Sequence, residues 1–289
     1  MSNTAKLPLR GVRVLDLAEG KVEMTGRLLA DMGADVFRVE PREGAASRRR
    51  EPLHAGVSLY FETHNVNKRG LALDLGDEDD RAVLLRLVAD ADIFIEAERP
   101  GALAALGLGV EDLQEVNPRL VVISISDFGQ TGPYRDWTGT NWTQMAAAGV
   151  LSRSGIPGRA PVQPPGELAI EATAVQAAYA ALLAYYHRLN TGTGEYVDAS
   201  VFESTVQVMA PPLGVGGSAT GGLSMLNLGR GRPDMSHLYP IYECADGYVR
   251  ALMLSKRQWH AMFRWLGAPE EFNDPKYDAT PARREAAPR

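Results

Sequence analysis

Short β-branched runs alternate with amphipathic segments through the first half of the chain, and this alternation restricts the fold more than any other feature. Residues 12–17 (VRVLDL) and 35–40 (DVFRVE) read as buried strands, and residues 22–34 between them have helical periodicity, so we predict a β-α-β unit. The pattern continues with strands expected at 71–75, 92–98 and 120–129 and helices at 78–89 and 110–117. It predicts an α/β fold, a Rossmann-like parallel sheet that binds ligands beyond the carboxyl ends of its strands.

The second half of the chain predicts the domain organisation. Residues 129–165 are rich in Gly, Pro, Ser and Arg, so we expect a loop with a helix at 141–151 inside it, followed by a long apolar helix from Glu167 to Leu189. We predict a large domain at 1–210, a glycine-rich linker at 211–233 and the start of a smaller α+β domain at 234–289. That domain should contain a hairpin around Asp246 and Gly247, a helix at 257–267 and a frayed end at 278–289.

Composition excludes several classes of function. Thirty Lys and Arg against 36 Asp and Glu give a formal charge of −6, so we expect neither nucleic acid nor an anionic membrane as a partner. Cys244 is the only cysteine and the five histidines are scattered, so we expect no metal site and a cytoplasmic location. The N-terminus has no apolar stretch typical of a signal peptide, and no apolar run reaches the roughly 20 residues of a membrane span. The glycine motifs of dinucleotide, P-loop and hydrolase sites are missing.

Six segments of the chain carry a colinear pattern: residues 8–17 (PLRGVRVLDL), 28–41 (LLADMGADVFRVEP), 65–75 (NVNKRGLALDL), 98–109 (ERPGALAALGLG), 117–134 (NPRLVVISISDFGQTGPY) and 194–205 (GEYVDASVFEST). Together they resemble the class III CoA-transferases of the CaiB/BaiF type, a family that includes formyl-CoA and carnitine CoA-transferases and the alpha-methylacyl-CoA racemases. The resemblance implies the CoA-transferase III fold, coenzyme A or acyl-CoA as substrate with a carboxylic acid as acceptor, and an interlocked homodimer or a heteromer with a related subunit. Members of that family continue beyond the point where this chain stops, so we expect the chain to be truncated relative to them.

The resemblance also implies the residues that hold CoA. In NVNKRG, we expect Asn67, Lys68 and Arg69 to bind phosphate, because Arg offers a planar fork and Lys a point charge. A solvated basic turn is the alternative.

Three other loops are candidates for CoA contacts. Gly20 and Lys21 occupy the loop after the first strand, although an exposed lysine at a helix start fits Lys21 equally well. Arg99 is retained from the family's ENFRPG-type loop, whereas Ala97 and Glu98 replace its Asn and Phe, and Ala105 stands where some transferases have Arg. A glycine-rich flap with Gly229 and Gly231 is the other candidate, with an interdomain linker as its alternative.

The segment TGTNWTQMAAAG (138–149) is where the resemblance places the catalytic aspartate, a nucleophile that attacks the acyl-CoA thioester. Here the position is Asn141, whose neutral amide cannot form the same anhydride. Three explanations stay open: Asn141 is an introduced substitution, another carboxylate such as Asp127, Asp136 or Glu167 acts instead, or the chain is a catalytically silent partner.

The racemases of the family use a histidine just before that aspartate and a second carboxylate at the start of the following long helix. In this chain Thr140 replaces the histidine, and Glu167 takes roughly the place of the carboxylate. Glu167 can equally serve as a cap that favours the helix dipole. An acyl-CoA racemase or lyase variant is therefore a further alternative.

Overall fold

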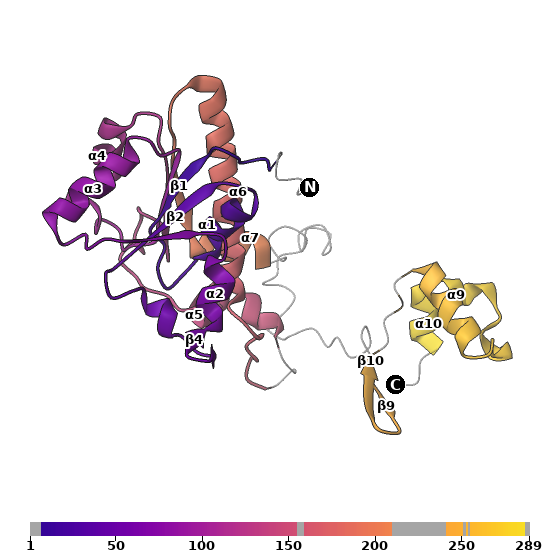
Figure 1. Ribbon diagram of the computed structural model, residues 1–289. Coiled ribbons are helices and arrows are strands. Elements are labelled where there is room, and N and C mark those ends of the chain that lie inside the picture. The colour runs from indigo at the N-terminus through magenta and orange to yellow at the C-terminus, as the bar shows by residue number, and fades with distance from the viewer. Residues whose placement is uncertain (1–6, 155–158, 210–240, 251–252, 254, 287–289) are drawn as a thin grey trace, which may run out of the picture. The chain divides into compact units, whose positions relative to one another are not determined.

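A computed structural model describes residues 7–154, 159–209, 241–250, 253 and 255–286 (Figure 1). They belong to two compact units, Met1–Ser154 with Pro161–Arg230 and Gly155–Ala160 with Gly231–Arg289, and each unit is described by itself. The predicted linker at 211–233, with Gly229 and Gly231, lies outside the described residues.

The first unit is built on a six-stranded sheet in the order β5-β2-β1-β6-β7-β8, and every neighbouring pair is parallel. The predicted α/β fold with a parallel sheet is therefore confirmed. The chain order reverses direction between β1 and β6, which makes the carboxyl ends of these two strands the expected ligand crevice. The strands are β1 (Arg13–Asp16), β2 (Asp35–Glu40), β5 (Arg69–Ala72), β6 (Ile93–Glu96), β7 (Val121–Ser126) and β8 (Tyr196–Ser200).

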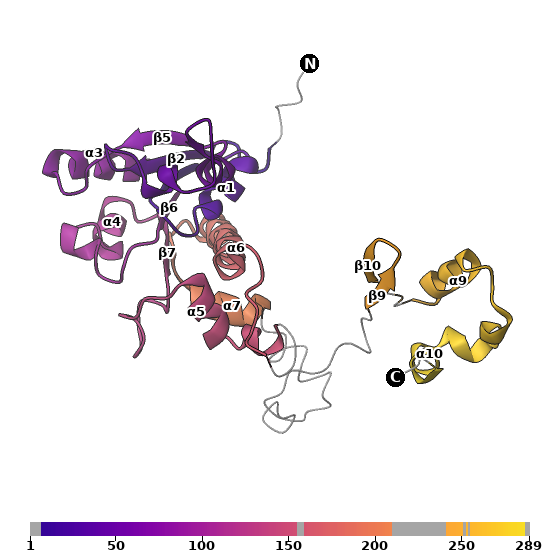
Figure 2. The same cartoon turned by 90° about the horizontal axis from the view of Figure 1, so that it is seen from below.

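Helices cover both faces of this sheet (Figures 1 and 2). Helices α3 (Glu78–Val88) and α4 (Val110–Val116) lie on one face, and α1 (Met24–Asp31) and α6 (Leu168–Thr191) lie on the other. The strand side chains alternate between the two cores: Ile93 and Ile95 pack toward α1 and α6, whereas Phe94 packs toward α3 and α4. Burial on both faces explains why the strands read as nearly continuous apolar runs.

Helix α6 confirms the long apolar helix predicted from Glu167 to Leu189. It ends at Gly192, whose φ of 79° favours glycine. By length and composition this helix could cross a membrane, contrary to the expectation from the sequence. In the structure, however, Ala174, Ala177 and Ala181 lie buried against the sheet, so one side of α6 belongs to the core.

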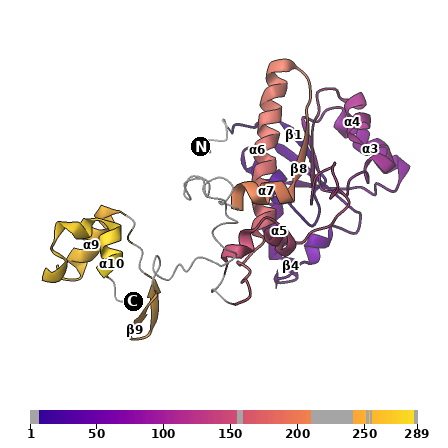
Figure 3. The same ribbon diagram turned by 180° about the vertical axis from the view of Figure 1, so that it is seen from behind.

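Shorter elements complete the first unit. The helix expected at 141–151 is shorter than predicted: α5 (Asn141–Ala147) stops just before Gly149, which has a φ of 77°, and a 3-10 turn (Val150–Arg153) follows. Helix α7 (Val201–Met209) continues from β8 and packs beside α5 and α6 (Figure 3). The remaining elements are η1 (Ala46–Arg49), β3 (Leu53–His54), β4 (Val57–Ser58), α2 (Leu59–Asn65) and η2 (Ala104–Leu106).

In the second unit, the predicted hairpin is confirmed as β9 (Ile241–Cys244) paired antiparallel with β10 (Gly247–Arg250), and the predicted helix as α9 (Lys256–Trp265). Two 3-10 turns follow, η5 (Glu270–Phe272) and η6 (Pro275–Asp278). The frayed end expected at 278–289 was wrong in part, because α10 spans Thr280–Ala286. Arg283 orders it by stacking 4.9 Å from the ring centre of Trp259 and donating to the carbonyl oxygen of Tyr277.

Candidate functional site

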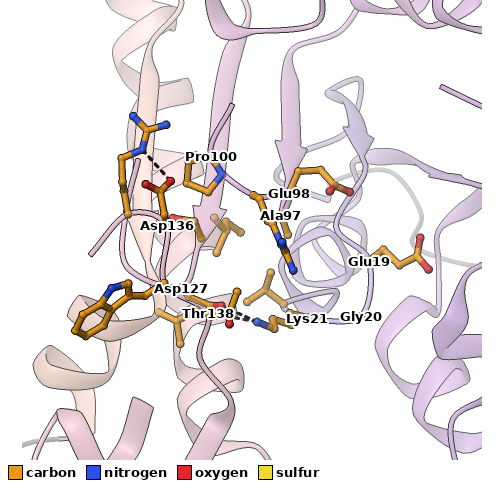
Figure 4. A pocket seen from close by; sticks show the side chains of 16 residues that line it. Glu19, Gly20, Lys21, Ala97, Glu98, Pro100, Asp127, Asp136 and Thr138 are labelled. Carbon is orange, nitrogen blue, oxygen red and sulfur yellow. Dashed lines mark hydrogen bonds and ion pairs between the residues drawn. The ribbon is translucent and has the colours of Figure 1, made fainter. Parts of the chain in front are cut away.

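A cavity of about 590 Å³ opens at the carboxyl ends of β1, β6 and β7 (Figure 4). Its walls are four chain segments, at 19–22, 97–100, 125–127 and 135–138, together with Val201 at the start of α7. The first three segments follow or end adjacent parallel strands, so the sheet itself brings them together. This is the crevice that the strand order predicts.

Lys21 projects into this cavity and pairs with Asp127. Its Nζ lies 2.8 Å from Oδ1 and 3.0 Å from Oδ2 of Asp127, and 3.1 Å from the carbonyl oxygen of Gly139. The Lys21 side chain is 42% exposed and that of Asp127 only 10%. Asp127 Oδ2 also accepts the backbone N–H of Gly139 at 2.8 Å. The Asp127 carboxylate thus accepts three hydrogen bonds from two donors, the Lys21 ammonium and the N–H of Gly139, so its oxygens are occupied and the arrangement favours a structural role over the catalytic alternative.

The cavity contains three cationic side chains, of which two were predicted. Lys21 and Arg99 lie on its walls as expected, together with Gly20. Arg135 was missed, although it follows a predicted strand and so belongs to the edge where ligands bind. Its Nε lies 3.4 Å from Asp136 Oδ1, and both side chains are largely exposed. The anionic residues of the wall are Glu19, Glu98, Asp127 and Asp136.

A second cavity, of about 290 Å³, shares Glu19 and Glu98 with the first. It lies at the carboxyl ends of β1, β2 and β5, and its apolar wall includes Leu73, Leu75 and Leu103. The two cavities therefore line one edge of the sheet.

The predicted phosphate site in NVNKRG is corrected by the structure. The Lys68 side chain is only 1% exposed, and its Nζ lies 2.7 Å from Asp16 Oδ2. Asn67 donates to Asp31 Oδ1 at 2.7 Å, and Arg69 pairs with Asp35 at 3.1 Å. Asp35 begins β2, so the guanidinium of Arg69 is held toward the amino ends of the strands, away from the cavity. Lys68 is therefore enclosed within the protein, whereas Asn67 and Arg69 are paired at the surface, and none of the three lines the cavity.

Asn141 is buried, with 8% of its surface exposed, and does not line the cavity. It is the first residue of α5, and its Oδ1 accepts the backbone N–H of Ala169 in the first turn of α6 at 2.9 Å. Its Nδ2 has only a weak partner, the sulfur of Met145 at 3.7 Å. The side chain thus joins the amino-terminal ends of α5 and α6, a geometry that an aspartate could also adopt.

Glu167 flanks the start of α6 but does not cap it, because its side chain accepts no N–H of the helix. Its carboxylate instead lies 2.8 Å from Arg50, whose guanidinium stacks 3.9 Å from the ring centre of Tyr60. The Glu167 side chain is 32% exposed. Glu167 thus stands at the N-cap position of α6 without a side-chain cap, and only the capping half of that alternative is wrong; the favourable interaction with the helix dipole stays a prediction.

One turn further along α6, Glu171 pairs with His64 of α2 at 2.7 Å, and the other ring nitrogen of His64 lies 2.8 Å from the carbonyl oxygen of Tyr60. Burial opposes the charged imidazole, but these hydrogen bonds prevail and raise the pKa of His64 above its ordinary value. For the neighbouring Tyr60, burial disfavours the charged phenolate and raises the pKa of the hydroxyl. The sequence indicates that Glu171 in an apolar helix needs a partner, but it does not identify His64, because the two residues lie far apart along the chain. Among the described residues, no group of three or more His, Cys, Asp or Glu side chains is arranged to hold a metal ion.

Comparisons with known proteins agree on one family. The model of CoA-transferase family III matches residues 9–289. A probable CoA-transferase of Mycobacterium tuberculosis, Rv1866, is 45% identical over 279 residues, which are 95% of this chain and 35% of that protein. The beta subunit of the succinyl-CoA–L-malate CoA-transferase of Chloroflexus aurantiacus is 38% identical over 205 residues, covering 70% of this chain and 51% of the subunit. The chain thus spans between a third and about half of the length of these relatives. A CaiB/BaiF family protein from Brucella suis has a similar structure, with a TM-score of 0.81, 30% identity, and coverage of 96% of this chain and 74% of that one.

Proposed function

Since the chain belongs to CoA-transferase family III, we propose that it binds the CoA part of an acyl-CoA thioester at the carboxyl edge of its sheet. We further propose that the protein moves CoA from that thioester to a carboxylic acid. The resemblance found in six sequence segments is confirmed by the family match along residues 9–289.

The observation that carries this proposal is the cavity of about 590 Å³ at the switch point of the sheet, with Lys21, Arg99 and Arg135 on its walls. The anionic CoA pyrophosphate would bind at these three cations, although four carboxylates, Glu19, Glu98, Asp127 and Asp136, lie on the same wall. The neighbouring cavity, with its leucine side chains, suits the flat adenine ring. A CoA molecule can thus extend along one edge of the sheet across two adjoining cavities.

For the transfer step we propose Glu167 as the alternative nucleophile, because Asp127 is held by Lys21 and the N–H of Gly139 and Asp136 is largely exposed. Glu167 is itself paired with Arg50 and lines neither cavity, so this step requires the acyl end of the thioester to extend beyond the two cavities and to displace Arg50. In the proposed step, a Glu167 oxygen attacks the thioester carbonyl carbon, the C–S bond breaks, and CoA leaves as the thiolate. The thiolate then attacks the Glu167 carbonyl of the resulting anhydride, which releases the donor acid and leaves a glutamyl thioester. The acceptor carboxylate reverses these two steps and leaves as the new acyl-CoA.

A second candidate function is a catalytically silent subunit, and the state of Asn141 favours it. The position that the resemblance assigns to the nucleophile carries a buried amide, and its oxygen is used to join two helices. A protein retained for assembly needs that structural bond but no carboxylate.

We also propose an interlocked homodimer, or a heteromer with a related subunit, in the cytoplasm. The relative from Chloroflexus is named as a beta subunit, which supports assembly with another chain. Val175, Tyr179, Leu183 and Tyr186 are exposed at helical spacing along α6, and an apolar stripe of this kind is typical of protein interfaces.

Isotope exchange tests the transferase. The protein is incubated with acyl-CoAs and the matching carbon-13-labelled acids, and label in the thioester is measured by mass spectrometry. Transfer by the wild-type chain that is lost in Glu167→Gln supports the proposed step. Transfer only in Asn141→Asp places the nucleophile at position 141 instead. If neither the wild-type chain nor Asn141→Asp transfers label, the proposal that this chain transfers CoA is overturned. Calorimetry with CoA then tests the second candidate, a catalytically silent subunit.

A further inference from the structure

We infer that four buried charged residues, Asp16, Glu23, Arg38 and Lys68, form a positioning device for the loop at 18–23 and hence for Lys21. We call them the buried charge cluster. None of the four residues lines either of the two cavities described above, so they can influence a ligand there only through the loop. The inference deepens the proposed function, since CoA is the ligand whose binding would depend on Lys21.

The acidic members hold the loop by its N–H groups. Glu23 Oε1 accepts the backbone N–H of Gly20 at 2.9 Å, and Asp16 Oδ1 accepts that of Ala18 at 3.0 Å. The side chains of Glu23 and Asp16 are completely buried. The first half of the loop is therefore held by carboxylates that solvent does not reach.

The basic members hold the same loop by its carbonyl groups. Arg38 donates to the carbonyl oxygen of Ala18 at 2.7 Å, and Lys68 donates to that of Glu23 at 2.6 Å. Within the cluster, Arg38 lies 3.2 Å from Glu23 Oε1, and Lys68 lies 2.7 Å from Asp16. Two cations and two anions balance, so the cluster is neutral as a whole.

Stability alone is a weak reason for such a cluster. Taking four charges out of water is costly, and apolar residues of similar volume often stabilise a core as well or better. The charged side chains instead fix the conformation of the loop, because each of them forms a hydrogen bond with a backbone atom of the loop. The loop needs this support: Gly20 has a φ of 71°, and Val22 has a φ of 49°, which is unfavourable for a β-branched residue.

The loop transmits its geometry to the cavity through one side chain. Lys21 lies between Gly20 and Val22, and its ammonium bridges Asp127 and the carbonyl oxygen of Gly139 on the opposite wall. If the loop relaxes, the bridge is lost and the cavity wall moves with it. The cluster therefore acts through Lys21.

Two variants loosen the loop, each with a matched control at the amino end of the sheet. Glu23→Gln removes one buried charge, and its control is Asp92→Asn, which removes the charge from the partly buried Asp92 that pairs with Arg188. Gly20→Ala strains the loop only through its backbone, because a Cβ there meets no neighbour. Its control is Gly11→Ala, which has an equally open position and a φ of 90°. Gly20→Ala serves as the test if Glu23→Gln does not fold.

Two measurements on the full chain test the inference. Hydrogen exchange by mass spectrometry should show the peptide around 18–23 exchanging about tenfold faster in both loop variants than in their controls. About tenfold is the size expected when a hydrogen bond to a charged group is weakened, as in Glu23→Gln, and when a Cβ is placed at a positive φ, as in Gly20→Ala. Calorimetry with CoA should show binding weakened about tenfold in the loop variants, with no further loss when Lys21→Met is added to Glu23→Gln.

Unchanged exchange at 18–23 in both folded loop variants would overturn the inference. So would an equal loss of CoA affinity in Glu23→Gln and Asp92→Asn, because that pattern reports general destabilisation. If the wild-type chain binds no CoA, the proposed function fails, and the exchange measurement still decides whether the cluster holds the loop.

Discussion

The bond between Asn141 and the first turn of α6 yields the sharpest prediction about stability. In Asn141→Ala, the backbone N–H of Ala169 loses its acceptor at a position where Ala169 is fully buried. An unsatisfied buried donor costs about 1–3 kcal/mol, and loss of a helix-capping side chain costs about 0.5–2 kcal/mol. We therefore expect Asn141→Ala to lower the free energy of unfolding by about 2 kcal/mol.

Asn141→Asp is the matched control, because it keeps an oxygen at the same place. The only bond lost is the weak one to Met145, and a negative charge beside the amino-terminal end of α6 is favourable. We expect this variant to stay within about 1 kcal/mol of the wild-type chain near neutral pH. Urea unfolding followed by far-ultraviolet circular dichroism measures both, and hydrogen exchange at 168–171 localises the effect.

We expect similar urea midpoints for the wild type and Asn141→Asp, and a lower midpoint for Asn141→Ala. The dependence of the unfolding free energy on urea concentration should be the same in all three. A midpoint for Asn141→Ala equal to that of the wild type would refute the capping role. Equal losses in both variants would also refute it, since they would show that the amide nitrogen rather than the oxygen matters.

Three further predictions concern other parts of the first unit. Gly194→Ala should destabilise the protein by about 2–3 kcal/mol in urea unfolding, because its Cβ would overlap the carbonyl oxygen of Leu120; a loss below that of an exposed Gly→Ala change would contradict the packing. The pKa of His64 is raised in the folded state, so its bond to Glu171 stabilises the fold fully below the unfolded pKa and less as the pH rises through the folded pKa. His64→Gln should therefore lower the free energy of unfolding more at about pH 5.5 than at about pH 8.5. A loss of stability that does not change with pH would contradict this role of His64. Lys21→Met should weaken CoA binding about tenfold at low salt in calorimetry and less at high salt, whereas an unchanged affinity would remove Lys21 from the site.

The elements of the first unit could be predicted closely because their signals are local. The strands β6 and β7 were recognised from apolar runs, and α6 from a long stretch of small apolar residues. One error concerns an end: the helix from Asn141 was predicted too long because Gly149 was not weighed as a stop. Two helices were missed, α2 in the first unit and α10 in a polar segment held by Arg283. Terminal residues depend on caps and contacts that periodicity does not report.

The residues of the candidate site could be predicted only where their position follows from the order of the strands. Gly20, Lys21 and Arg99, which the resemblance proposed as CoA contacts, line the cavity at the carboxyl edge, and the parallel topology explains why residues that follow neighbouring strands meet there. Arg135 obeys the same rule and could have been found by applying it to the strand at 121–126.

The partners of buried polar side chains could not be predicted, because short motifs do not show whether such a side chain faces solvent or another residue. Examples are Lys68, Asn141 and the pair of His64 with Glu171. The ammonium of Lys68 looks like a phosphate ligand in NVNKRG, yet Asp16 and the carbonyl oxygen of Glu23 enclose it in the folded chain. Local periodicity was therefore sufficient for most strands and helices of the first unit, and the parallel topology for the edge where we propose that CoA binds. The partners of buried polar groups were decided by contacts between residues distant in sequence, which form only when the sheet and its helices pack.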